Sequence, residues 1–201
     1  MPESAEEVYA RVVTAAGEDG RLPLPPVTEW DTFPFEGDLR TRPLQPPVEA
    51  ETPRHGADGV GCWRCANPDG DVIWRNERWT VASTQQPTGL PLVLFLQSRE
   101  HMDFHEMDDD LAAEFGRATN HLHRIMAHLP NIGRVHIGKW GDGSEHLHVW
   151  FMARTARIEQ TLGSFAAIWD DVLPPVPEEI WRADLHEVAR KLATHDGEAL
   201  V

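Results

Sequence analysis

The sequence predicts an α+β domain that combines consecutive strands with one long central helix. Three observations support this fold class. Short apolar segments follow one another through the middle of the chain, one segment between residues 108 and 129 has helical periodicity, and proline-rich sequence precedes this core. We therefore expect three parts along the 201 residues: an N-terminal helix and proline-rich arm in 1–56, a core in 57–157, and a C-terminal helical extension in 158–201.

The N-terminal part is expected to be a helix followed by an irregular arm. Ser4 can cap the helix, with Glu7 three residues further on, and the next turns carry valines on one side. The tract from residue 21 to residue 56 is rich in proline, which fixes φ and removes backbone donors. Because the tract also contains aromatic side chains, we expect it to be extended and to lie on the surface of the core.

The core segments indicate five strands. DVIWRNERWTVAST predicts two short strands that are joined around Asn76 and Glu77. LPLVLFLQ is a continuous apolar run bounded by Pro87 and Gly89, which is typical of a buried strand. GRVHIGKW and HLHVWFMA predict two more strands, and the glycine loop GDGSE joins them.

Helices are expected in the middle and at the end of the chain. The acidic residues Asp108–Asp110 begin a helix at its favourable dipole end, and its apolar residues recur at helical spacing as far as Leu129. Pro130 ends this helix. Thr161–Leu173 and Glu178–Thr194 predict two further helices, separated by the breaker PPVP.

Composition restricts the classes of partner. The formal net charge of −15 repels polyanions at long range, which argues against nucleic acid, although a local site can still bind a small phosphorylated substrate. No apolar run approaches the roughly 18 residues needed to span a membrane. The N-terminus also lacks the features of a signal peptide, so we expect a cytoplasmic protein without a membrane partner.

The only two cysteines, Cys62 and Cys65, have the spacing C-x-x-C. In a reducing compartment this spacing predicts metal binding or redox chemistry. A redox pair needs a strand before the motif and a helix after it, whereas a Pro-Asp-Gly turn follows here, so we favour a metal. A closed zinc site takes four ligands. His101, at the end of the buried strand, and His146 are the candidates for the other two, with His105 and nearby carboxylates as weaker rivals.

Two histidines, His146 and His148, lie two residues apart in the last apolar segment. Alternate residues of a strand face opposite sides, so His146, His148 and Trp150 share one face. One face of this strand can therefore belong to the core while the other forms a site. Taken alone, the pattern also fits two half-exposed histidines on an edge strand.

The ordered set of segments resembles the histidine triad (HIT) family, including its zinc-bearing hydrolases, and is similar to the related galactose-1-phosphate uridylyltransferases. The resemblance runs through CWRC, VLFLQSREH, EMDDDLAAEFGRATNHLHRIM, GRVHIGKWGDGS and HLHVWFM. It implies a HIT-like antiparallel sheet with one long central helix, to which this chain adds an N-terminal arm and C-terminal helices. It also implies a homodimer, because family members commonly pair.

The resemblance further implies roles for single residues. It assigns zinc to Cys62, Cys65, His101 and His146, and it makes His148 the nucleophile that forms a covalent nucleotidyl-histidine. Neutral imidazole suits this role near pH 7, and a backbone carbonyl at one ring nitrogen would fix its tautomer. The expected function is a nucleotidyl or phosphate-ester hydrolase or a nucleotidyltransferase, acting on a nucleotide or sugar nucleotide beside a structural zinc site.

Further residues are candidates for substrate binding. The glycine loop would offer backbone N–H groups through Gly141 and Gly143, and Ser144 a hydroxyl, to phosphate oxygens, although the loop also fits a simple connection between strands. Lys139, on the strand that enters the loop, would neutralise phosphate. Gln85 stands where HIT hydrolases usually carry an acidic residue that binds ribose hydroxyls.

One departure from the family pattern concerns catalysis. Trp150 occupies the third triad position, where the family has histidine and the uridylyltransferases have glutamine; indole has one donor and no acceptor. A register with Ser144, His146 and His148 as the triad would put Glu145 where an apolar residue belongs, so we prefer the first register. The alternatives are a catalytically degenerate HIT-like zinc protein that binds a ligand or partner, and a purely structural zinc domain.

Overall fold

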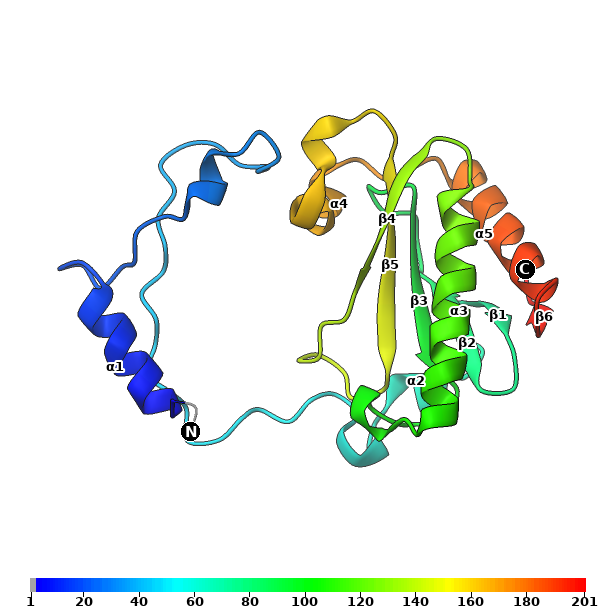
Figure 1. Cartoon of the computed structure of the whole chain (residues 1–201), viewed down its shortest axis with the longest axis horizontal. Coiled ribbons are helices and arrows are strands. Elements are labelled where there is room, and N and C mark those ends of the chain that lie inside the picture. Colours follow the sequence, from blue (N-terminus) through cyan, green and yellow to red (C-terminus); the bar gives the residue numbers. More distant parts are fainter. Residues whose placement is uncertain (1–2) are drawn as a thin grey trace. The chain divides into compact units, whose positions relative to one another are not determined.

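The structure, a computed structural model, describes residues 3–201. The chain divides into two compact units, Met1–Pro53 and Arg54–Val201. The first unit contains helix α1 (Ala5–Ala15) and a 3-10 turn at Pro26–Glu29, joined by extended segments (Figure 1). The Ser4 side chain accepts from the Glu7 N–H and the Glu7 carboxylate accepts from the Ser4 N–H, which confirms the predicted cap. None of the described residues of α1 is buried.

The second unit is built on a six-stranded sheet with the order β4-β5-β3-β2-β1-β6. Every pair of neighbouring strands is antiparallel, as the resemblance implies. The Asn76 side chain accepts from the N–H groups of Arg78 and Trp79 and so forms the predicted turn between β1 and β2. The strands are β1 (Val72–Arg75), β2 (Trp79–Ser83), β3 (Leu92–Ser98), β4 (Ile132–Gly138), β5 (His148–Thr155) and β6 (Glu198–Ala199).

Helices cover both faces of this sheet. The long helix α3 (Asp109–Ala127) and helix α5 (Glu178–Ala193) pack on one face (Figure 1). Helix α4 (Ala166–Val172) contacts the other face, where Ala167 meets a small apolar cluster. A four-residue helix, α2 (Trp63–Ala66), follows Cys62. Within the described residues, no helix combines the length and the apolar character that crossing a membrane requires.

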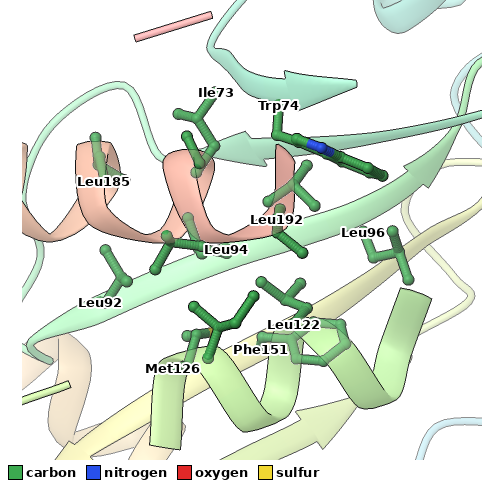
Figure 2. Packing of buried hydrophobic residues seen from close by; sticks show 14 of the residues in the cluster. Ile73, Trp74, Leu92, Leu94, Leu96, Leu122, Met126, Phe151, Leu185 and Leu192 are labelled. Atoms are coloured by element: carbon green, nitrogen blue, oxygen red, sulfur yellow. The ribbon is translucent and has the colours of Figure 1, made fainter. Parts of the chain in front are cut away.

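The alternation along β3 separates the two faces. Leu92, Leu94 and Leu96 point into the main core between the sheet and helices α3 and α5, as Figure 2 shows. Val93 and Phe95 point to the opposite face. The same alternation in β5 sends Val149 and Phe151 into the core, so the intervening side chains are left for the other face.

Two predicted elements differ from the structure. Thr161–Leu173 is not one helix: two 3-10 turns, Glu159–Thr161 and Gly163–Phe165, precede α4, because Leu162 is extended and Gly163 has a φ of +72°. The last strand begins at His148 rather than at His146, since the Leu147 N–H donates to the Met102 carbonyl outside the sheet.

The C-terminal segment is part of the same compact unit as the core. Strand β6 pairs with β1, and α5 buries five side chains in the main core. Replacing Leu185, which is 5% exposed there, with alanine should lower the free energy of unfolding by about 2–5 kcal/mol. Urea denaturation measures this change, and Ile180→Ala on the same helix, where the side chain is 53% exposed, should change it little. Equal effects of the two substitutions would contradict this packing.

A stacked histidine pair joins α3 to the end of α5. The rings of His121 and His195 lie 4.1 Å apart between centroids. Burial lowers the pKa of His121, and the positive charge of a protonated His195 lowers it further. As the pH falls below about 6.5, His121 takes up a proton in the unfolded chain more readily than in the folded protein. The contribution of His121 to the free energy of unfolding is therefore fully present above this pH and is lost as the pH drops toward the folded pKa.

Substituting His121 with glutamine should flatten this pH dependence. Urea midpoints at pH 7.5 and pH 5.5 measure it, and His186→Gln at an exposed site of α5 is the matched control. If the urea midpoint of the His121 variant changed between the two pH values as much as that of the wild type, another group would be responsible for the pH dependence.

Candidate metal centre and active site

Three elements bring the predicted metal ligands together. Cys62 and Cys65 are three residues apart at the start of the short helix α2, so their thiols lie on one side of a single turn. His101 follows the end of β3 and His146 precedes β5, and these two strands are neighbours in the sheet. The four ligand atoms all lie within 4.8 Å of one another.

The spacing of this Cys62–Cys65–His101–His146 cluster fits zinc. The His146 Nδ1 atom is 3.4 Å from the Cys62 Sγ and 3.6 Å from the Cys65 Sγ, and the His101 Nδ1 is 3.5 Å from the Cys65 Sγ. Tetrahedral zinc, with bonds of about 2.3 Å to sulfur and about 2.0–2.1 Å to nitrogen, separates S and N ligands by about 3.6 Å. Donor type, number and separation therefore all suit this metal.

Outer contacts orient both histidines of the cluster. The His146 Nε2–H donates to the Ser98 carbonyl at 2.8 Å, which leaves the Nδ1 lone pair directed at the thiols. The His101 Nε2 atom lies 3.5 Å from a Glu145 carboxylate oxygen, an ion-pair contact without good hydrogen-bond geometry. Glu145 is itself held by Arg54 at 3.1 Å. Each imidazole thus presents the same ring nitrogen to the centre.

The protonation states also suit metal ligands. Burial lowers the pKa of His146, so its imidazole stays neutral. Burial raises the pKa of the Cys62 thiol, but hydrogen bonds from Cys65, His101 and the backbone outweigh it, and the net shift is downward. Burial and the neighbouring Cys62 raise the pKa of Cys65.

His148 has the orientation that a nucleophile needs. Its Nδ1 atom lies 2.8 Å from the His146 carbonyl oxygen. A carbonyl can only accept, so Nδ1 carries the proton and Nε2 keeps its lone pair. This is the backbone contact that was expected to fix the tautomer. Since His146 is held in the cluster, the same residue links the metal centre to the position of the His148 ring.

A cavity of about 630 Å³ opens in front of His148. Ser144, His146 and His148 line it on one side, and Gln85 lines it from the loop after β2. Trp63 and Arg64 from α2 and Phe95 and Gln97 from β3 also line it, together with His55, Gly61, Asp71, Ser83 and Thr84. Its volume lies within the range of about 300–1,000 Å³ that is typical of small-molecule sites.

Arg64 places a buried positive charge in the wall of this cavity. The side chain is 7% exposed, and its Nη1 donates to the carbonyls of Gly70 at 2.7 Å and Asn67 at 3.2 Å. Its guanidinium carbon lies 5.0 Å from the centre of the Trp63 ring. The Nε atom is buried without a hydrogen-bond partner in the described part of the chain. Burial lowers the pKa of Arg64, but the usual value is so high that the guanidinium stays protonated.

Lys139 lies away from the cavity, although the sequence suggested a role in phosphate binding. Its ammonium nitrogen is 3.4 Å from Asp103, whose carboxylate also binds Arg54 at 2.7 Å. Burial would raise the pKa of Asp103, but the Phe104 N–H and the two cations hold it at about 2. The charge of Lys139 is thus neutralised within the protein.

The glycine loop is also used differently from the expectation. The Gly141 carbonyl accepts from Arg54 at 3.3 Å, and the Gly143 carbonyl accepts from the His55 N–H at 2.9 Å. Of the loop's predicted binding residues, Ser144 lines the cavity; neither glycine is among the described residues that do so. The loop is held by the segment that precedes the two cysteines.

Trp150 belongs to an aromatic cluster beside the cavity. Its ring packs edge-on against Phe95, at 4.6 Å between centroids, and against Trp140, at 5.7 Å. Phe95 lines the cavity, whereas Trp150 is not one of the described lining residues. Its indole Nε1 is buried with no hydrogen-bond partner among residues 3–201. The third triad position therefore supports the cavity wall through packing.

Sequence reasoning missed several lining residues, among them Arg64 and Gln97. The sequence suggested no binding role for Arg64, yet it faces the cavity from inside the C-x-x-C motif. Gln97 was treated as the end of an apolar run. The period-2 rule could have found it, because Gln97 shares a strand face with Phe95 and is polar in an otherwise apolar segment.

Comparisons with known proteins identify the fold. No protein-family model matches the chain, and no curated protein sequence matches it. Among solved structures, a histidine triad protein from Bradyrhizobium japonicum superposes with a TM-score of 0.50 at 14% identity, covering 63% of this chain and 92% of its own. The described core therefore has the histidine triad fold.

Two further structures are similar at lower scores. A Zn-bound histidine triad family protein from Mycobacterium smegmatis has a TM-score of 0.46 at 15% identity, over 66% of this chain and 95% of its own. A hypothetical histidine triad nucleotide-binding protein from Sulfolobus tokodaii has a TM-score of 0.46 at 14% identity, over 65% of this chain and 90% of its own. None of the three is a galactose-1-phosphate uridylyltransferase, so that part of the resemblance stays a prediction.

Proposed function

We propose that this chain, whose core has the histidine triad fold, is a nucleotidyl or phosphate-ester hydrolase or a nucleotidyltransferase that acts through a covalent nucleotidyl-histidine at His148. The observation that supports this most directly is the hydrogen bond from the His148 Nδ1–H to the His146 carbonyl at 2.8 Å. It fixes the tautomer in which the neutral ring has its lone pair on Nε2, which is the atom that would attack phosphorus.

The first step forms one bond and breaks one. The Nε2 lone pair of His148 attacks the α-phosphorus, an N–P bond forms, and the bond from phosphorus to the leaving group breaks. The leaving group departs with the electron pair and takes a proton from solvent. The His146 carbonyl stabilises the positive charge on the imidazole because it accepts from Nδ1–H throughout.

The second step restores the imidazole. Water, or the hydroxyl or phosphate group of a second substrate, attacks phosphorus while the N–P bond breaks and its electron pair returns to Nε2. The proton of the attacking group passes to solvent. Hydrolysis and transfer therefore share the same intermediate and differ in what enters the cavity of about 630 Å³.

The other lining residues suit a phosphorylated substrate. The buried guanidinium of Arg64 offers a charge to phosphate oxygens. Gln85 and Ser144 offer hydrogen bonds to sugar hydroxyls or phosphate. Zinc, when bound to the Cys62–Cys65–His101–His146 cluster, would supply rigidity, with no open position needed for substrate. Held in this way, the backbone of His146 positions the His148 ring.

Intact-mass spectrometry tests the proposal. Wild-type protein is mixed with the p-nitrophenyl esters of adenosine and uridine 5′-monophosphate, or with UDP-glucose, and quenched without acid. We expect a mass increase equal to one nucleotidyl group. Ligand binding by calorimetry without an adduct or released product would instead favour the catalytically degenerate alternative.

A further inference from the structure

The residue opposite His148 on the neighbouring strand is a glutamine. Gln97 of β3 pairs with His148 of β5 in the sheet register, and both side chains line the same cavity. In an antiparallel pair the Cβ atoms of opposite residues are about 4.5–5.5 Å apart. The carboxamide of Gln97 therefore reaches the space that the imidazole of His148 faces.

The carboxamide oxygen of Gln97 has no structural hydrogen bond. This Oε1 atom is buried, and it has no hydrogen-bond partner within the described chain. An unpaired buried acceptor is unfavourable, and no structural hydrogen bond of this oxygen would be lost if the carboxamide turned toward a ligand. The carboxamide can turn about its last bond, so either its oxygen or its NH₂ group can meet that ligand.

The next residue pair on the same face of the two strands is apolar. Phe95 pairs with Trp150, and their rings pack together beside the cavity. The indole of Trp150 cannot accept a hydrogen bond, and its own N–H is buried. On this sheet face the polar group beside His148 is therefore supplied by the partner strand and not by β5 itself.

We propose that Gln97 is a catalytic residue whose NH₂ group donates to the non-bridging oxygens of the phosphoryl group that His148 attacks. Phosphoryl oxygens are acceptors and gain charge in the transition state, so a positioned donor stabilises them. The Arg64 guanidinium lines the same cavity and neutralises the charge of the substrate, while Gln97 acts at the reacting phosphorus. This inference rests on the proposed function of His148.

Two substitutions of Gln97 separate hydrogen bonding from packing. Gln97→Met keeps the length of the side chain and removes both polar groups, and Gln97→Glu keeps the shape but replaces the donors with a negative charge. The rate constant for adduct formation is measured by quenched-flow mass spectrometry with the p-nitrophenyl ester of uridine 5′-monophosphate. We expect it to fall by about 10²- to 10³-fold in both variants.

Zinc content and melting temperature should stay at their wild-type values in both variants, which a merely structural role would not predict. Gln86→Met, the same change at an exposed glutamine in the loop after β2, should keep the wild-type rate. If one Gln97 variant fails to fold, the other still decides the question.

The possible failures are distinguishable. Adduct formation within about twofold of wild type in a folded Gln97 variant, together with none in His148→Ala, would overturn the role of Gln97 and leave the nucleophile in place. Absence of both adduct and turnover in the wild-type protein would overturn the proposed function and this inference with it.

Discussion

Replacing His148 with alanine is expected to abolish the nucleotidyl adduct and to lower kcat by at least about 10⁴-fold, because the group that forms the covalent intermediate is removed. Substrate binding should persist, since the lining residues Arg64, Gln85 and Ser144 remain. Intact-mass spectrometry and steady-state release of p-nitrophenol measure the two effects.

Chemical rescue sharpens this test. Removal of the ring leaves a space beside the cavity, so added imidazole should restore turnover with the p-nitrophenyl esters without restoring the protein adduct. His186→Ala, at an exposed position of α5, is the matched control and should behave as wild type. An adduct of wild-type yield in His148→Ala would place the nucleophile elsewhere.

Loss of a zinc ligand should have the second large effect. Cys62→Ser or His146→Ala should reduce the metal content from about one zinc per chain to little or none, because zinc needs all four ligands in a closed site. Both side chains are buried, with 5% and 2% exposed, so an unoccupied site also leaves polar groups unsatisfied. We expect several kcal/mol of lost stability, since a ligand at about 1,000 times its Kd contributes about 4 kcal/mol.

Elemental analysis and thermal unfolding, with and without EDTA, measure this prediction. His105→Ala is the control, because His105 was the rival ligand and its ring lies at an exposed position beside Asp103. His148→Ala should also keep its zinc, which separates the metal centre from the chemistry two residues away. Purified protein with no metal and with a disulfide between Cys62 and Cys65 would support the redox alternative.

Much of the fold could be predicted because its signals are local. Asn76 forms the turn between β1 and β2 through its own side chain, and Asp108 caps α3 by accepting from the Leu111 N–H. The alternation in β3 predicts a strand with two different faces. The prediction of a single helix over Thr161–Leu173 was wrong, because Leu162 and Gly163 have non-helical backbone angles. A helical pattern of apolar residues does not reveal such an interruption.

The candidate site was predictable in part. Cysteines at C-x-x-C spacing and histidines at strand ends define a ligand set by residue type, and the structure brings that set within 4.8 Å. For the charged residues, no sequence pattern predicted which of them line the cavity. Lys139 was a candidate for phosphate binding by sequence, but it lies against Asp103, whereas Arg64, which the sequence did not single out for binding, lines the cavity.

The sequence by itself determined the order of strands and helices and the residue types of the candidate metal cluster, because these depend on residue type and spacing along the chain. Only the tertiary structure decided which side chains meet across elements. The register of β3 against β5 sets Gln97 beside His148 and Phe95 beside Trp150. Such pairings depend on the register between two strands that are about 50 residues apart in the chain, and this register is set when the strands pack together.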